Sequence, residues 1–437
     1  MDSNTIAVII LLATFFILIL LRVNIAFAVG IASCLCLLYL GIPLSNVCQQ
    51  MVKGLNSFSL MAVPFFITMG GLMGSGGISE RLILLADSMV GWMRGGAAMV
   101  NILASLFFGG ISGSASADTA SLGNIEIPMM VNMGYDADFS TAVTITSSVE
   151  GLLIPPSHNM VIYATAAGGL SVGALFMAGY IPGVMLALSL MIGSYIISVK
   201  RNYPKGQPFH LKTFIKCFKS AIWALLSVLI VVVGVVFGVL TATESAAIAV
   251  IYSLIVGLCI YREMTWKDVW NALGECIDTL SIVLILCGTS SIFGYCLTYL
   301  HVPDLAANAI IGFSESPIVI ALLINAILLV LGCVMDMAPI ILIATPILLP
   351  VATSIGSMDA LDYLVWHYYG IKLRNWSFDS PGWNLPVYFI GNFPSADRKD
   401  CQGNPSILSV HDSGTVASYI CSGIHHAASQ SFLWGIK

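Results

Sequence analysis

Apolar residues recur along the chain in long runs separated by short polar stretches, the pattern of a membrane protein built from several helices. Two shorter amphipathic stretches, 79–93 and 266–276, have tryptophan and basic residues at or beside them and predict helices lying in the membrane interface. The sequence therefore predicts an all-α, polytopic membrane protein. The runs read as membrane helices are 6–21, 25–40, 55–73, 172–199, 221–240, 245–261 and 280–297.

Between residues 100 and 131, a row of small polar residues separates two apolar arms that are each too short to cross a bilayer. A crossing takes about 20 mostly apolar residues. Backbone without helical hydrogen bonds survives at membrane depth only where it lines a cavity or is covered by protein. We therefore predict a re-entrant hairpin whose tip, 109–118, faces a site. A second pair of short arms, 318–334 and 339–355, predicts a second hairpin.

The next segment, 142–166, has a helical composition but contains Pro155 and Pro156. The two prolines remove two amide donors and push Ile154 out of the helical region, so we predict a helix broken at mid-membrane. Half-helix ends offer partial positive charge at N-termini and partial negative charge at C-termini, which suits an anion and a bare cation. A simple proline kink is the alternative.

Composition supports membrane insertion and adds few other constraints. Hydrophobic residues make up 58% of the chain and charged residues 9%, which excludes a soluble domain of this size. The 11 cysteines are scattered without metal-ligand spacing and behave as small hydrophobes. The run 6–21 follows no basic residue and precedes no small-residue cleavage site, so it reads as a membrane helix instead of a signal peptide.

The basic residues orient the chain in the membrane. The richest basic loop, 199–219, is placed in the cytoplasm by the positive-inside rule. Counting crossings from that loop makes the first hairpin enter from the cytoplasm and the second from outside. The two hairpins also correspond weakly in sequence, with Asp118 matching Asp336. Opposite topology and weak correspondence predict an inverted repeat, the architecture of many secondary transporters.

Four motifs in this order resemble the large membrane subunit (DctM-like, or M subunit) of tripartite ATP-independent periplasmic (TRAP) transporters. The resemblance covers about residues 1–357. The motifs are Gly76-Gly-Ile-Ser-Glu-Arg81, Gly109-Gly-Ile-Ser-Gly-Ser-Ala-Ser-Ala-Asp118, Ile154-Pro-Pro-Ser157 followed by Val161-Ile-Tyr163, and Thr241-Ala-Thr-Glu-Ser-Ala-Ala247.

The resemblance implies a sodium-coupled importer of organic anions, such as C4-dicarboxylates, sialic acid or sugar acids, in the bacterial inner membrane. It implies a small membrane (Q) subunit and a periplasmic substrate-binding (P) protein as partners, sodium as coupling ion and no other cofactor. The implied fold is that of an elevator-type secondary transporter, similar to the ion transporter superfamily. A channel and an intramembrane enzyme are the less favoured alternatives. A channel would need a continuous polar lining, whereas the polar residues here cluster at the tips, and an intramembrane enzyme would need a nucleophile with its base, for which no histidine is obviously placed beside Ser112 or Ser114.

The candidate site residues combine this resemblance with the local chemistry. Serines at the tip offer hard oxygen ligands, although small residues also allow close helix packing. A carboxylate inside a membrane is costly and usually pairs or lines a pathway, but Glu150 and Glu244 could equally cap helices or pair across the bundle. Thr289 and Ser290 could instead bond back to their own helix. The substrate candidates are Ser114, Ser116, Asp118, Pro155, Pro156, Ser157, His158, Thr289 and Ser290, and the sodium candidates are Gly110, Ser112, Gly113, Ser157, Gly288, Gly332 and Asp336.

The predicted organisation alternates scaffold and transport parts. Residues 1–95 and 167–278 form the scaffold, 96–166 form the first hairpin and broken helix, and 279–357 form the second-repeat helix and hairpin. Residues 358–437 depart from the family, because the second broken helix and the last membrane helix expected there are missing. We hypothesise a shift of reading frame near residue 357, which would leave an inactive remnant of a transporter. A soluble appended domain is the alternative.

Overall fold

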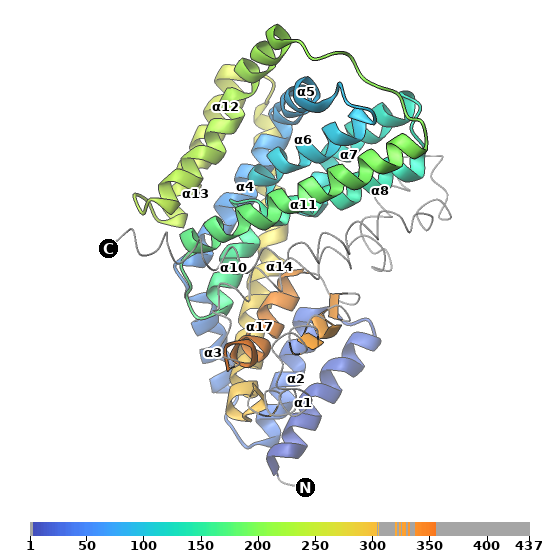
Figure 1. The fold of residues 1–437 in the computed structure, drawn as a ribbon. Helices are drawn as coiled ribbons and strands as arrows, with labels where there is room; N and C mark the ends of the chain where they lie inside the picture. Colours follow the sequence, from blue (N-terminus) through green and yellow to red (C-terminus); the bar gives the residue numbers. More distant parts are fainter. Residues whose placement is uncertain are drawn as a thin grey trace. The chain divides into compact units, whose positions relative to one another are not determined.

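The computed structural model of the chain consists of helices joined by short turns (Figure 1). It describes residues 3–303, 305, 320, 323–324, 326–328, 331–332 and 337–354, without the side chains of 116, 117 and 351–354. Within these residues, the extended backbone pairs only at an isolated bridge between Arg94 and Lys205. The helices are α1 (Ser3–Leu20), α2 (Ile25–Tyr39), α3 (Ser45–Leu55), η1 (Ser59–Met61), α4 (Ala62–Ser75), α5 (Ile78–Val90), α6 (Gly96–Ser112), α7 (Ala115–Asn132), α8 (Ala137–Ser148), α9 (Glu150–Leu153), α10 (His158–Ala166), α11 (Val172–Lys200), α12 (Leu211–Val236), α13 (Ala242–Ile255), η2 (Val256–Tyr261), α14 (Trp266–Tyr299) and α17 (Met337–Ser354).

The helices confirm a multi-pass, all-α membrane protein. In the part of the chain that the structure describes, 5 helices are long and apolar enough to cross a membrane, and each overlaps a predicted run. The inverted repeat, the elevator architecture and the division into scaffold and transport parts stay predictions. The spans are Ser3–Leu20, Val172–Lys200, Leu211–Val236, Ala242–Tyr261 and Trp266–Tyr299.

The predicted span 55–73 is wrong in its bounds. The structure has instead a bent pair, Ser45–Leu55 and Ser59–Ser75, whose axes differ by 63°. Asn56 leaves the helical region with φ −82° and ψ 63°, which ends α3. Because α3 has polar residues on one side, a search for apolar runs passes over it.

The predicted interfacial helix 266–276 is not separate from the membrane helix that follows. Both belong to α14, which runs unbroken for 34 residues. A capping box starts it, since the Asp268 carboxylate accepts hydrogen bonds from the Thr265 amide at 2.8 Å and the Thr265 hydroxyl at 2.6 Å. The sequence contains no proline between the two predicted pieces, so nothing ends the helix there.

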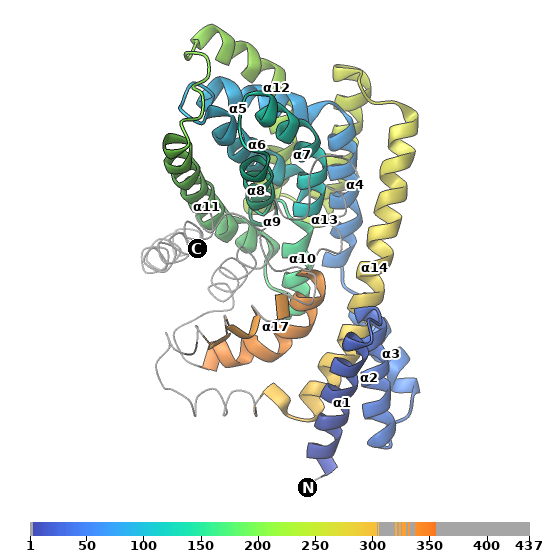
Figure 2. The same ribbon diagram turned by 90° about the vertical axis from the view of Figure 1, so that its right-hand side faces the viewer.

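The chain forms two compact units. The first contains residues 3–76, 156–177 and the described residues from 227 onward. Its helix α14 packs along α2, α3 and α4 (Figure 2). Phe15 of α1 and Phe293 of α14 lie 5.6 Å apart between ring centroids in the buried core of this unit.

The second unit contains residues 77–155 and 178–226. Its centre is α6, which packs against α5, α7, α8 and α9 (Figure 2). Helix α6 is almost entirely buried in this unit. Its residues are mostly small and apolar, but the helix is too short to span a membrane. The predicted hairpin and the first part of the predicted break therefore lie in one unit.

Candidate functional site

The predicted hairpin tip is a two-residue turn between α6 and α7. Helix α6 ends at Ser112, and Gly113 follows with φ 61°, in the left-handed region that favours glycine. The Gly113 amide donates to the Gly109 carbonyl at 3.0 Å, and α7 begins at Ala115. The structure thus confirms a helical hairpin at the predicted position, while its re-entry into the membrane stays a prediction.

The predicted helix break lies between α9 and α10. Ile154 is extended, with φ −81° and ψ 123°, and Ser157 is extended, with φ −127° and ψ 129°. Because Pro155 and Pro156 have no amide hydrogen, they cannot donate to the carbonyls of Gly151 and Leu152 as a continued helix would. This interruption is larger than a kink, so the broken helix is confirmed.

The hairpin and the break meet through two glycines. A side chain on Gly109 would overlap the backbone of Gly151, so α6 and α9 touch backbone to backbone. The Asp118 carboxylate of α7 also lies against Gly151, and the Ser112 hydroxyl donates a hydrogen bond to its other oxygen. The tip residues therefore contact the broken helix within one unit.

Three carboxylates are fully buried around this contact: Asp118, Glu126 and Glu150. Among the described residues, Asp118 Oδ2 and all four glutamate oxygens have no hydrogen-bond partner, and Asp118 interacts electrostatically with both glutamates. Helices α6, α7, α8 and α9 contain no lysine, arginine or histidine to balance them. Unpaired carboxylates are expensive at membrane depth and mark a functional site.

Glu126 is the site residue that the sequence analysis missed. It lies between Ile125 and Ile127 in the apolar second arm of the hairpin. An acidic residue inside an apolar membrane segment is the same signal that identified Asp118.

The described residues contain no group of three or more His, Cys, Asp or Glu side chains arranged to hold a metal ion. A cation bound at this contact would therefore need backbone and hydroxyl oxygens as well as carboxylates. Such oxygens occur at the end of α6 and at the break between α9 and α10.

A ladder of side-chain hydrogen bonds fixes the hairpin against α8. Asn101 Nδ2 donates to the Thr144 hydroxyl at 2.7 Å, and the Ser147 hydroxyl donates back to Asn101 Oδ1 at 2.8 Å. The Thr119 hydroxyl of α7 donates to the Ser148 hydroxyl at 2.7 Å. Polar bonds of this kind hold membrane helices together, so the positions of the tip and the break depend on each other.

The remaining candidates of the first repeat lie along the break or at the tip. Pro155, Pro156 and Ser157 are buried, and the Ser157 hydroxyl has no hydrogen-bond partner in the part of the chain that the structure describes. His158 is the first residue of α10 and is half-buried. The Ser116 side chain lies outside the described residues. The binding roles of all these residues stay predictions.

The candidates of the second repeat lie in the other unit. Gly288 and Thr289 belong to the unbroken α14, where Gly288 faces Met51 of α3 and Thr289 faces Gly30 of α2. The Thr289 hydroxyl donates to the Ile285 carbonyl at 3.0 Å, which is the back-bonding that the sequence left open. Ser290 and Gly332 are buried. Asp336 lies outside the described residues.

Glu244, in contrast, is exposed at the start of α13. Its carboxylate accepts hydrogen bonds from the Thr241 amide at 2.8 Å and the Thr241 hydroxyl at 2.9 Å. Of its two possible roles, helix capping is confirmed.

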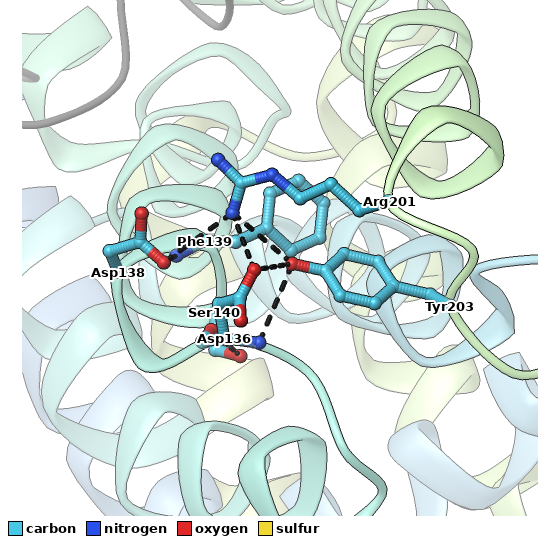
Figure 3. A network of polar contacts seen from close by, with 6 residues as sticks. All are labelled: Asp136, Asp138, Phe139, Ser140, Arg201 and Tyr203. Atoms are coloured by element: carbon cyan, nitrogen blue, oxygen red, sulfur yellow. Dashed lines mark hydrogen bonds and ion pairs between the residues drawn. The ribbon is translucent and has the colours of Figure 1, made fainter.

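A clasp with the exposed residues Asp136 and Arg201 and the buried Tyr203 joins the α7–α8 turn to the loop after α11 (Figure 3). Arg201 pairs with Asp136 at 2.7 Å and with Asp138 at 3.6 Å, and it lies 5.9 Å from the centre of the Phe139 ring. The Tyr203 hydroxyl donates to Asp136 at 2.5 Å. The clasp therefore holds the base of the hairpin to α11.

The interactions of Asp136 in the clasp predict that the stability of the folded protein depends on pH. The Tyr203 hydroxyl and then Arg201 lower the pKa of Asp136 below its ordinary value. A carboxyl with a lowered pKa in the folded state stabilises the fold above its ordinary pKa, and this stabilisation is lost as the pH falls. Because the Asp136 side chain is 55% exposed, we expect less than about 1 kcal/mol.

Thermal unfolding of the purified chain between about pH 6 and about pH 2 measures this effect, because the stabilisation is lost as the pH falls from the ordinary pKa of an aspartate toward the lowered one. Asp136→Asn should flatten the loss of stability, whereas Asp278→Asn, at an exposed carboxylate of α14, should leave it as in the parent. Equal slopes in the parent and in Asp136→Asn would show that the clasp does not contribute.

The family model described as "Tripartite ATP-independent periplasmic transporter, DctM component" matches residues 12–370. The chain is 42% identical over 352 residues to the uncharacterized protein YgiK of Salmonella typhimurium, and the aligned region covers 80% of this chain and 81% of that protein. It is 38% identical over 308 residues to the sialic acid TRAP transporter large permease protein SiaM of Vibrio cholerae, covering 70% and 72%. It is 39% identical to the isethionate TRAP transporter permease protein DctMQ of Oleidesulfovibrio alaskensis, covering 79% of this chain but 55% of that longer protein.

A solved structure shares the fold. The YdaH transporter of Alcanivorax borkumensis superposes with a TM-score of 0.62 at 14% identity, covering 87% of this chain and 89% of that one. The family match runs past residue 357 to residue 370, and the comparisons give no support to a shift of reading frame; residues 358–437 lie outside the described part. The matched length and the identities establish that the chain belongs to the DctM component family of tripartite ATP-independent periplasmic transporters.

Proposed function

We propose that this chain is the large membrane subunit of a sodium-coupled importer of organic anions in the bacterial inner membrane. It would act with a small membrane subunit and a periplasmic substrate-binding protein. The observation that supports this proposal is the contact between the hairpin tip and the helix break, where buried oxygens lack hydrogen-bond partners among the described residues. Two chain interruptions that meet at buried, unpaired oxygens are the arrangement by which secondary transporters bind ions.

The cation would bind beside Ser112. The carbonyls of Gly151 and Leu152 lose their helical donors to the two prolines, and Gly110 and Gly113 bring further backbone to the tip. Carbonyl and hydroxyl oxygens are hard ligands that suit an alkali ion. The nearby Asp118 supplies negative charge, which no basic residue of α6 to α9 cancels.

The substrate would be a small anion. Sialic acid and isethionate appear in the names of the relatives SiaM and DctMQ, and both compounds are organic anions. In this chain, the start of α7 presents free backbone amides beside Ser114 and Ser116, and helix N-termini attract anions. Because α6 to α9 lack basic residues, a bound cation would help to balance the charge of the substrate. That dependence would couple the two ligands.

Uptake into proteoliposomes tests the function. The chain, its small membrane subunit and its periplasmic binding protein are reconstituted together, and a panel of radiolabelled organic anions is offered with an inward sodium gradient. We expect uptake of at least one anion, and loss of that uptake when potassium replaces sodium. Uptake that is equal in both salts would exclude sodium coupling.

Ser112→Leu tests the cation site directly. The leucine removes an oxygen and fills the tip, so we expect uptake to fall below one-tenth of the parent while the protein still inserts. Ser189→Leu is the matched control, because the Ser189 hydroxyl donates to Met185 of its own helix at 2.7 Å. Unchanged sodium dependence in Ser112→Leu would place the cation elsewhere.

A further inference from the structure

The end of α11, the loop after it and the first turns of α12 carry a concentration of positive charge. Residues 200–219 contain six basic side chains, and no acidic residue occurs between Glu150 and Glu244. All six basic residues are exposed. Ion pairs within the described residues involve Arg201 but none of the five lysines. The six are Lys200, Arg201, Lys205, Lys212, Lys216 and Lys219.

Three of these lysines form a stripe on α12. At about 100° per residue, Lys212, Lys216 and Lys219 fall within an arc of about 60°. Trp223 lies on the same arc one turn further along the helix and is 41% exposed. In membrane helices, lysines lie among the lipid headgroups, and tryptophan lies at the boundary between the headgroups and the apolar interior. The order of these residues along α12 fits that arrangement.

An apolar face lies directly beside this lysine stripe. Its members occupy a neighbouring arc of about 100° by the same helical geometry. Phe214 and Phe218 stack at 6.0 Å between ring centroids. The exposed members are Leu211 at 61%, Ile215 at 45% and Phe218 at 41%.

We propose that the lysine stripe of Lys212, Lys216 and Lys219 is a docking surface for the headgroups of anionic phospholipids. The negative phosphates complement the unpaired lysines, while the apolar face beside them contacts the upper acyl chains. Trp223 lies where the headgroups end. The stripe occupies the first turns of a 26-residue helix that is apolar enough to span the membrane, so lipid headgroups are at the same depth.

Lipid bound here would also act on the base of the hairpin. The loop before α12 is tied to the start of α6, since the Gly95 amide donates to the Pro204 carbonyl at 3.2 Å and Arg94 donates to Asn202 at 3.4 Å. Tyr203 in the same loop belongs to the clasp on Asp136. The lipid surface and the candidate site therefore belong to one connected unit.

Trp223 provides a built-in reporter for the test. The full chain is reconstituted into vesicles of phosphatidylcholine that contain either brominated phosphatidylglycerol or brominated phosphatidylcholine, and tryptophan quenching is measured. The signal of Trp223 is the difference between the parent and Trp223→Phe. We expect anionic lipid to bind beside Trp223 at least about fivefold more strongly than zwitterionic lipid, the effect of one lysine at an anionic surface.

The triple variant Lys212→Gln, Lys216→Gln, Lys219→Gln should lose this preference. The matched control Lys53→Gln, Arg262→Gln, Lys267→Gln removes the same charge at exposed positions elsewhere and should keep it. High salt should weaken the preference in the parent, because exposed charges are screened. A preference that survives in the stripe variant would overturn the proposal. A parent preference that disappears when the small membrane subunit is added would assign the stripe to that subunit.

Discussion

Gly109→Ala is expected to abolish both uptake and most of the folded protein. The added methyl group would overlap the Cα atom and the amide nitrogen of Gly151. These backbone atoms cannot rotate away as the end of a long side chain can. Overpacking a tight interior costs about 1–3 kcal/mol, and a clash with backbone lies at or above the upper end of that range. The midpoint of thermal unfolding in detergent, together with uptake, measures the effect.

Two glycines of α14 are the matched controls. A methyl group on Gly274 or Gly294 meets nothing within 4 Å. Alanine is a better helix former than glycine by about 1 kcal/mol, so Gly274→Ala and Gly294→Ala should leave the unfolding midpoint unchanged or raise it. If Gly109→Ala matches these controls, then α6 and α9 do not touch in the way described.

The elements of the site were predictable from the sequence because their causes are local. Two adjacent prolines stop a helix wherever they occur, so Pro155 and Pro156 predicted the break without knowledge of the fold. The small residues around Gly113 likewise predicted a turn between two helical arms. Both elements are where the sequence placed them.

The bounds of other helices depend on packing, which the sequence pattern does not contain. Trp266 and its neighbours have the composition of an interfacial helix, but α14 continues through them because no residue ends it. The bend at Asn56 separates α3 from α4 although the apolar run continues past it. A count of apolar residues cannot distinguish a straight helix from a bent pair.

The contact between Gly109 and Gly151 was not predictable either, because it joins segments that are distant in the sequence. Each glycine alone is an ordinary small residue of a membrane helix. Only the packing of α6 on α9 shows that both positions exclude any side chain. Glu126 differs, since its burial among apolar neighbours was visible in the sequence.

Replacing Pro155 and Pro156 together by alanine is expected to abolish uptake without reducing the amount of folded protein. The two alanines restore the amides that pair with the carbonyls of Gly151 and Leu152, so α9 and α10 can join into one helix. A proline inside a helix costs about 3 kcal/mol, and its removal favours that continuous form. The oxygens that we assign to the cation would then be occupied by helical hydrogen bonds.

The control for this double variant is Pro182→Ala, because Pro182 lies inside the continuous helix α11. Its replacement also restores a backbone amide, but that amide cannot pair with the carbonyl oxygens of Gly151 or Leu152 at the break. Uptake should therefore stay near that of the parent. Uptake against sodium concentration separates the possible causes of a loss. A cation site lost in Pro155→Ala, Pro156→Ala shows as a sodium requirement that cannot be saturated, whereas a merely slowed transporter saturates at the parent concentration with a lower maximum. Parent-like uptake by the double variant would mean that the carbonyls of Gly151 and Leu152 bind no ion, and the cation would then have to be sought among the carboxylates alone.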